Sequence, residues 1–386
     1  MIQDMSFLKY EYPLLYEDNS SNKCFVSVAE YCGDCSWQSE CGGSEHLFYR
    51  IYNRKDIGYS VYDLNPQCSD FAERVTEVNG FSLSDIHAKR YSIPKPPNVI
   101  PLVRKGDFGS RWGVSNSCIA TGISPLVYRK RNMRSLRSYH KLSPRTLIIV
   151  TGCCKDQVLE NLWLRRDNNT MLSVFRLESP CLFIAPDFSL YANSPRCCHM
   201  YNTKRSLIVF ERMQAEGIPV IPFVSLHNSF DVRRWGNWLN NNTDVTMAAM
   251  SFQTLKHDTK MWEKSVDLLR RLDIMTERRL HWIIIGVAAK EKMTLMRNTI
   301  QSLSIIASKP VVAAARGELL INGKPYPSPN QDKLLLARRN LIDLESRFMG
   351  ELSLDFFNPK VPCHSSVDDD SKITGRPLTL FSEQLL

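Results

Sequence analysis

Six short apolar runs alternate with helical patterns between residues 147 and 348, and this alternation limits the fold more than any other feature of the sequence. Each run is apolar almost throughout, as expected for strands that helices cover on both faces. Strand–helix–strand connections are right-handed and make the joined strands parallel. The predicted strands are 147–151, 181–185, 218–225, 245–251, 281–287 and 310–315. The predicted helices are 156–165, 202–216, 230–239, 258–272, 290–306 and 330–348.

We therefore expect one α/β domain with a parallel sheet at residues 147–350. The six units, with an extra strand at 98–103, favour an irregular or incomplete (β/α) barrel, and a doubly wound open sheet is the alternative. Neither a glycine-rich dinucleotide fingerprint nor a phosphate-binding loop occurs in the required strand–turn–helix context.

Three further regions flank this domain. We expect a Cys-rich N-terminal region at 1–95, a basic linker at 96–146 and a polar tail at 351–386. Hydrophobic residues make up 43% and charged residues 23%, which excludes a fully disordered or fibrous chain. The apolar runs are far shorter than the ~20 residues of a membrane span, and residues 1–19 lack the apolar core of a signal peptide. We expect a cytoplasmic protein without membrane contact.

Positive charge is concentrated in one segment. The net charge is +9, and residues 108–155 contain nine lysines or arginines and no acid. Such a density suits contacts with phosphates, so DNA or RNA is the expected partner. Tyr128, Tyr139 and His140 would add base stacking. The alternatives are a solvated basic face and an internal partner for acidic residues. The candidate nucleic-acid-binding residues are Arg129, Lys130, Arg131, Arg134, Arg137 and Lys141.

Polar residues follow four of the predicted strands, where ligands gather in parallel α/β folds. They are Asp187 as base or nucleophile, His227 as proton carrier, Gln253 as hydrogen-bonding partner and Arg316 as anion holder. The alternative is a local role for each residue, such as an Asx-turn at Asp187.

Cysteine is frequent, with twelve residues, and adjacent pairs without a signal peptide favour a reducing compartment. Cys32 and Cys35 form a C-x2-C knuckle that, with Cys41 and His46, could bind zinc. Adding Cys24 to the three cysteines would instead suit an iron–sulfur cluster. Thiols without a metal are the third alternative.

Two segments carry a resemblance to a known family. Residues 185–189 read Ala-Pro-Asp-Phe-Ser and residues 217–222 read Gly-Ile-Pro-Val-Ile-Pro. Together they resemble an uncharacterised family encoded by phages, plasmids and other mobile elements, which implies no activity.

The layout is also similar to phage-type members of the tRNA-guanine transglycosylase superfamily. Those are (β/α) barrels whose strand-end aspartate attacks the sugar during base exchange, and Asp187 would be the matching residue. The chain lacks the Asp-Ser-Gly-Gly-Phe segment of that superfamily, and its cysteine cluster precedes the barrel.

Two functions follow from these patterns. The first is an enzyme that modifies or cleaves a base or nucleotide through Asp187. The second is a non-catalytic nucleic-acid-binding or protein-interaction adaptor on a degenerate barrel. An open pocket joining Asp187, His227 and Arg316 would favour the enzyme, and a filled barrel mouth with the basic face elsewhere would favour the adaptor.

Overall fold

The computed structural model describes residues 77–91, 93–104, 118–128, 135–178, 181–190, 196–255 and 258–350. Eight strands in these ranges belong to parallel sheets: β1 (Val99–Pro101), β2 (Cys118–Gly122), β3 (Leu147–Thr151), β4 (Cys181–Ile184), β5 (Val220–Ile221), β6 (Met247–Ser251), β7 (His281–Ile285) and β8 (Leu303–Ala307). The α-helices are α5 (Ser124–Val127), α6 (Leu136–Tyr139), α7 (Asp156–Leu164), α8 (Asn169–Leu177), α9 (Arg196–Ala215), α10 (Ser229–Asn241), α11 (Thr259–Met275), α12 (Lys290–Thr299), α13 (Lys309–Ala315) and α14 (Lys333–Met349).

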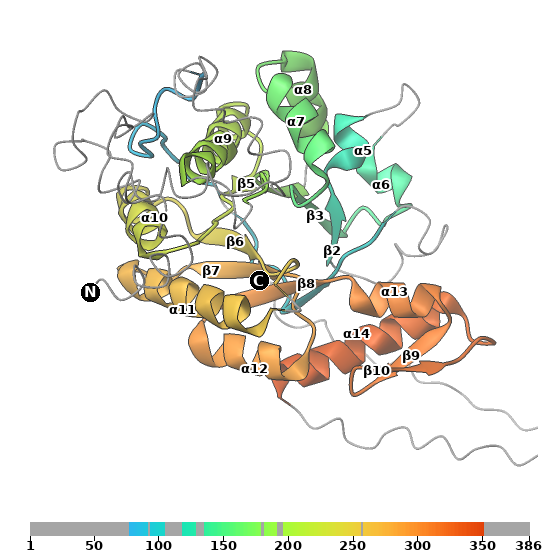
Figure 1. Cartoon of the computed structure of the whole chain (residues 1–386). Helices are drawn as coiled ribbons and strands as arrows, with labels where there is room; N and C mark the ends of the chain where they lie inside the picture. The colour runs from blue at the N-terminus through green and yellow to red at the C-terminus, as the bar shows by residue number, and fades with distance from the viewer. Residues whose placement is uncertain are drawn as a thin grey trace, which may run out of the picture. The chain divides into compact units, whose positions relative to one another are not determined.

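The strands form two four-stranded parallel sheets, in the orders β1-β8-β7-β6 and β2-β3-β4-β5. Single parallel bridges join the sheets at both ends, Leu102 to Ala120 beside β1 and β2, and Phe223 to Ala249 beside β5 and β6. Following these pairs, the order runs from β1 to β8 along the chain and returns to β1. Helices α9 to α12 lie outside the strands (Figure 1).

The prediction of an α/β fold with parallel strands is confirmed. Five of the six predicted runs contain β3, β4, β5, β6 and β7, and the extra strand expected at 98–103 is β1. Every residue of β3, β4 and β7 except Leu147 is buried, which agrees with the apolar runs that predicted them. Strands β1 and β2 lie in the segment expected to be a basic linker, and both pair with strands of the sheets.

The sixth predicted strand is wrong. Residues 310–315 lie in helix α13, and the strand is β8, which overlaps the end of the predicted helix 290–306. Proline is well tolerated in the first turn of a helix, where Pro310 stands, and the alanines that follow favour a helix. Helix α12 ends at Thr299, which leaves the buried run Leu303–Ala307 free to pair between β1 and β7.

Side-chain caps begin two of the helices, and a glycine follows the end of a third. The Asn228 side chain accepts hydrogen bonds from the backbone nitrogens of Phe230 and Asp231 and caps α10. Asp258 caps α11 in the same way. Gly217 follows α9 with φ of +74°, a left-handed conformation that glycine adopts without strain.

After α13, the chain forms an antiparallel hairpin of β9 (Glu318–Ile321) and β10 (Lys324–Pro327). The hairpin and α14 lie next to each other (Figure 1). The fully buried Asn340 joins α14 to the hairpin, since its side chain accepts from the Leu320 nitrogen and donates to the oxygens of Pro310 and Glu318.

Residues 77–91 cross the outer helices and add Phe81 and Ile86 to the core. The segment is held by buried side chains that donate to it from α9 and α10. Lys204 bonds to the Asp85 carboxylate, Arg234 to the Phe81 oxygen and Trp238 to the Ile86 oxygen. Within the described ranges, no helix is both long enough and apolar enough to cross a membrane.

Candidate active site at the ends of strands β3 and β4

Asp187 lies in the loop after β4, and the residues on either side of it contact α7 and α9. The Pro186 oxygen accepts from the Ser206 hydroxyl of α9 at 2.7 Å. Arg205 lies over the Phe188 ring with its guanidinium carbon 4.0 Å from the ring centroid. The Ser189 hydroxyl donates to Asp156, the first residue of α7, at 2.5 Å. The Asp187 backbone is therefore fixed between α7 and α9.

Close backbone packing brings the ends of β3 and β4 together. The Gly152 nitrogen donates to the Ile184 oxygen at 3.2 Å, and the Asp187 nitrogen donates to the Gly152 oxygen at 3.3 Å. A β-carbon on Gly152 would lie 2.6 Å from both the Ala185 oxygen and the Pro186 α-carbon. Glycine at 152 thus permits the approach that sets the two loops side by side.

Cys153 lies close to Asp187. The Asp187 charge acts on the Cys153 thiol, and the Cys153 backbone nitrogen donates to the Thr151 hydroxyl at 3.0 Å. Burial and the Asp187 charge raise the pKa of the Cys153 thiol well above its ordinary value. Burial and the same carboxylate raise the pKa of Cys154 to about 12. Both thiols therefore stay protonated at neutral pH.

The pKa of the Asp187 carboxyl is higher than that of an exposed aspartate. Burial raises its pKa from 3.8 to about 7, the nearby Cys153 thiol opposes this rise, and the Asp156 charge adds to it. A carboxyl with a pKa near 7 can both take up and release a proton at neutral pH.

His227 comes after β5, the strand that pairs with β4. It contacts His199, which the sequence patterns did not indicate as a site residue. Its ring stacks on that of His199 from α9, with centroids 4.2 Å apart and planes 24° apart. The His227 backbone nitrogen donates to the Asp231 carboxylate at 2.8 Å, which holds the start of the loop against α10. His227 comes six residues after the end of β5.

Gln253 and Arg316 have different positions. Gln253 follows β6 as predicted, is exposed, and packs against the backbone of Gly286 after β7. Arg316 follows helix α13, so the prediction that it follows a strand is wrong. A helix after a parallel strand leads the chain back toward the amino ends of the strands. Arg316 is exposed at that helix end, and it does not share the strand-end position of Asp187.

Of the predicted nucleic-acid-binding residues, Arg137 and Lys141 fall in the described ranges. The Arg137 guanidinium donates to the backbone oxygens of Ser143 and Thr146, so it supports the local turn. Lys141 is exposed. The other four, Arg129, Lys130, Arg131 and Arg134, lie outside the described residues.

The predicted metal ligands Cys32, Cys35, Cys41 and His46, and the alternative ligand Cys24, also lie outside the described residues. Within the described part of the chain, no group of three or more His, Cys, Asp or Glu side chains is arranged to hold a metal ion. The thiols of Cys118, Cys153, Cys154 and Cys181 are free.

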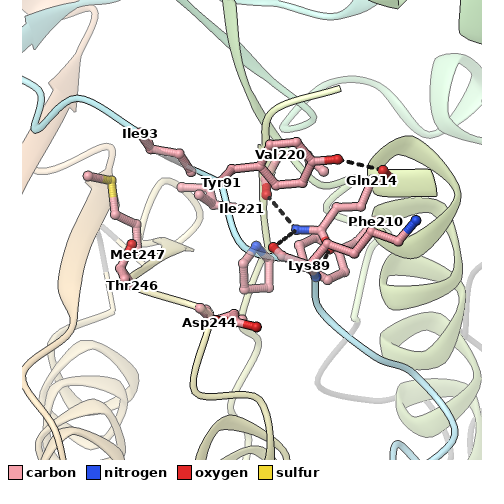
Figure 2. A pocket seen from close by; sticks show the side chains of 12 residues that line it. Lys89, Tyr91, Ile93, Phe210, Gln214, Val220, Ile221, Asp244, Thr246 and Met247 are labelled. Atoms are coloured by element: carbon pink, nitrogen blue, oxygen red, sulfur yellow. Dashed lines mark hydrogen bonds between the residues drawn. The ribbon is translucent and has the colours of Figure 1, made fainter. Parts of the chain in front are cut away.

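A shallow hollow that is open to solvent lies beside β5 and the start of β6 (Figure 2). Its wall combines Tyr91, residues of α9, strand β5 with Pro222 after it, and the chain entering β6. Tyr91 donates its hydroxyl proton to the Gln214 oxygen at 2.5 Å. Neither Asp187 nor His227 lines this hollow.

Two site residues were not predicted. Cys153 carries a sequence signal, because it comes two residues after a buried apolar run, as Asp187 comes two residues after the buried Ala185. His199 carries none, since the predicted helix began at residue 202 and the observed helix begins at Arg196.

Residues 131–274 match the model of a family described as a domain of unknown function (DUF4417). The matched span contains β3 to β6 and with them Cys153, Asp187, His227 and Gln253. This agrees with the predicted resemblance to an uncharacterised family. The association with phages and plasmids stays a prediction. No curated protein matches the chain.

Proposed function

We propose that this chain is a nucleic-acid-associated enzyme of a mobile element, in which Asp187 acts on a base or nucleotide. The observation that carries the proposal is the largely enclosed Asp187 carboxyl in the loop after β4, whose pKa desolvation raises to about 7. Strongly shifted carboxyl groups at strand ends are typical of catalytic sites, because a group that ionises near the working pH transfers protons efficiently.

The proposal includes a closed (β/α) barrel formed by β1 to β8. The two bridges between the parallel sheets, Leu102 to Ala120 and Phe223 to Ala249, support closure, because they leave each edge strand with a neighbour. In such barrels, ligands bind at the carboxyl ends of the strands, and Asp187 and His227 come three and six residues after β4 and β5. These two residues follow paired neighbours, β4 and β5.

Two roles suit the Asp187 carboxyl. As a carboxylate, it can remove a proton from a bound base or water, or attack a sugar carbon and form a covalent intermediate. When protonated, it can deliver a proton to a leaving base. His227 on the adjacent strand end is proposed to carry protons to and from this carboxyl.

Nucleic acid as the substrate class is supported by the basic segment, in which residues 108–155 contain no acid. Zinc bound by Cys32, Cys35, Cys41 and His46 belongs to the same proposal, with an iron–sulfur cluster through Cys24 as the alternative. Elemental analysis of freshly purified protein distinguishes them, because it shows zinc, iron or neither.

The deciding experiment compares the wild-type chain with Asp187→Asn. Both proteins are incubated with the nucleic acid that copurifies with the wild type, and the products are analysed by mass spectrometry for altered, exchanged or released bases. We expect conversion by the wild type and a loss of at least about 100-fold in the variant, as for removal of a general acid–base group.

Asp258→Asn is the matched control, because it makes the same chemical change at an exposed helix cap of α11. Asparagine caps helices as well as aspartate does, so this variant should keep wild-type activity. Equal product formation by wild type and Asp187→Asn would remove the catalytic role of Asp187.

One observation favours the adaptor as a second candidate. The hollow in Figure 2 is lined by residues of α9, of β5 and of the chain entering β6, and neither Asp187 nor His227 lines it. An adaptor would retain nucleic acid or a protein in both the wild-type and Asp187→Asn forms and would leave the bound nucleic acid chemically unchanged.

A further inference from the structure

One face of α9 contacts the backbone on both sides of Asp187. The Ser206 hydroxyl donates to the Pro186 oxygen at 2.7 Å, and the Asn202 side-chain nitrogen donates to the Ser189 oxygen at 2.8 Å. Ser206 and Asn202 are four positions apart, so they lie on the same face of the helix. This face therefore holds the residue before Asp187 and the second residue after it.

Arg205 lies on the same face of α9, between these two contacts. Its guanidinium carbon is 4.0 Å from the centroid of the Phe188 ring, which belongs to the residue directly after Asp187. One terminal nitrogen donates to the Asn202 side-chain oxygen at 2.7 Å. The two terminal nitrogens also donate to the two carboxylate oxygens of Glu160 on α7, at 2.7 Å and 2.9 Å. Such a two-point contact is directional, so it fixes the plane of the buried guanidinium on which the ring lies.

We infer that Arg205 is a positioning residue of the candidate site, which links α7, α9 and the Phe188 ring and thereby fixes the direction in which the Asp187 side chain leaves the loop. This inference rests on the proposed function of Asp187. It deepens that proposal by naming the group that holds the acidic residue in place. Arg205 acts on Asp187 through the neighbouring residues and takes no part in the reaction itself.

The sign of a change in the pKa of Asp187 separates positioning from a direct effect of charge. Desolvation is the largest cause of the raised pKa of Asp187, and the Arg205 charge is not among the causes. Releasing the loop should admit water to the carboxyl and lower its pKa. Removing a positive charge that acted directly on the carboxylate would instead raise the pKa. A fall therefore indicates positioning, and a rise indicates a direct electrostatic role.

The test measures the ionisation of Asp187 directly, by carbon NMR of the full chain labelled at aspartate carboxyl carbons, with Asp187→Asn to assign the signal. We expect Arg205→Ala to lower the pKa of Asp187 from its value of about 7 by about one unit or more. Arg205→Lys keeps the charge but lacks the planar fork that contacts Glu160 and Phe188, so it should lower the pKa as well. An unchanged or raised pKa in either variant overturns the inference.

Arg347→Ala is the matched control, because Arg347 is also buried and also bonds to a carboxylate, that of Asp343, through its Nε at 2.9 Å. It lies on α14, and it donates a further hydrogen bond to the Ala288 oxygen in the loop after β7. This variant should lose stability in denaturant, while its Asp187 signal should titrate as in the wild type. A similar fall of the Asp187 pKa in both alanine variants would show that general loosening of the fold is sufficient, and would overturn the positioning role.

Asn202→Ala covers the case in which the Arg205 variants fail to fold. Asn202 is partly exposed, and its side chain joins Arg205 to the Ser189 oxygen, so its loss releases one backbone contact of the loop. We expect the pKa of Asp187 to fall in this variant too, by less than in Arg205→Ala. If Asn202→Ala leaves the pKa of Asp187 at its wild-type value, the inference fails.

These readouts do not require enzymatic activity. If the pKa of Asp187 falls as expected but the wild type converts no nucleic acid, the positioning role stands and the proposed function fails. If the wild type converts nucleic acid and Arg205→Ala changes neither the pKa of Asp187 nor the rate, the proposed function stands and the positioning role fails.

Discussion

The backbone nitrogen of Asp187 donates a 3.3 Å hydrogen bond to the carbonyl oxygen of Gly152, and this contact joins the loops that follow two neighbouring parallel strands. The contact depends on the absence of a side chain at 152. The position of Asp187 therefore depends on backbone contacts. A displacement of the backbone at residue 152 should move Asp187 as well.

Gly152→Ala should destabilise the fold and displace Asp187. The added β-carbon would meet backbone atoms of Ala185 and Pro186 at 2.6 Å, and backbone cannot move aside as a flexible side chain can. Such overpacking costs about 1–3 kcal/mol, measured as the free energy of unfolding in denaturant. Gly122→Ala is the control. It lies opposite Thr151 at the end of β2, and its β-carbon would meet nothing within 4 Å. Equal stability of both variants would contradict the packing argument.

Asp187→Asn should raise stability, and the gain should increase with pH. Because burial raises the pKa of Asp187 from 3.8 to about 7, the unfolded chain ionises first and stability falls as pH rises from about 4 to 7. Asparagine does not ionise, so it removes this loss. Asp187 is partly exposed, so we expect a gain about 1–3 kcal/mol larger at pH 8 than at pH 4, below the full value of the shift. Denaturant titrations of both proteins across this range measure it, and a pH-independent difference would refute it.

Sequence patterns located most of the strands because burial on both faces leaves a continuous apolar run. They missed β2, where Cys118–Gly122 is short, ends in Thr-Gly and lies in the basic segment. They misplaced β8 because two apolar runs are adjacent there, and the run that begins with Lys-Pro fits the first turn of a helix.

Only part of the candidate site could be predicted from the sequence. Asp187 and His227 could be selected because each follows its own apolar run. The closeness of Asp187 to Cys153 depends on the register of β3 against β4, in which Thr151 lies opposite Ile184. A shift of one residue would turn the neighbouring side chains to opposite faces, and the apolar runs do not define register that closely.

Acid should destabilise the protein through two buried histidines. Burial lowers the pKa of both His140 and His281 from 6.5 to about 4, and the charges of Lys95 and Arg279 add to the effect at His281. A base with a lowered folded pKa contributes stability above pH 6.5 that is lost as pH falls toward 4.

We test this at His281, whose ring nitrogens lie 2.9 Å and 3.0 Å from the hydroxyl oxygens of Ser302 and Ser304. His281→Gln keeps hydrogen-bonding capacity and cannot titrate, so the free energy of unfolding should fall less steeply between pH 6.5 and 4 than in the wild type. His87→Gln, at an exposed position, is the control. An unchanged slope in His281→Gln would exclude His281 as a source of acid sensitivity.

Neutralising the basic segment should weaken binding of nucleic acid. Changing Arg129, Lys130, Arg131 and Arg134 to alanine removes four positive charges, and each lost phosphate contact should lower the salt dependence of binding by up to about 0.9 in logarithmic slope. Fluorescence anisotropy with labelled RNA and DNA oligonucleotides at several salt concentrations measures both quantities.

The charge-matched control changes four exposed cations on α11 and α12, Lys260, Lys264, Arg270 and Lys290, to alanine. If net charge alone drives binding, both variants weaken equally. If the segment forms the binding face, only the first loses affinity and slope, and a wild-type protein that binds neither nucleic acid at low salt would assign the segment to another partner.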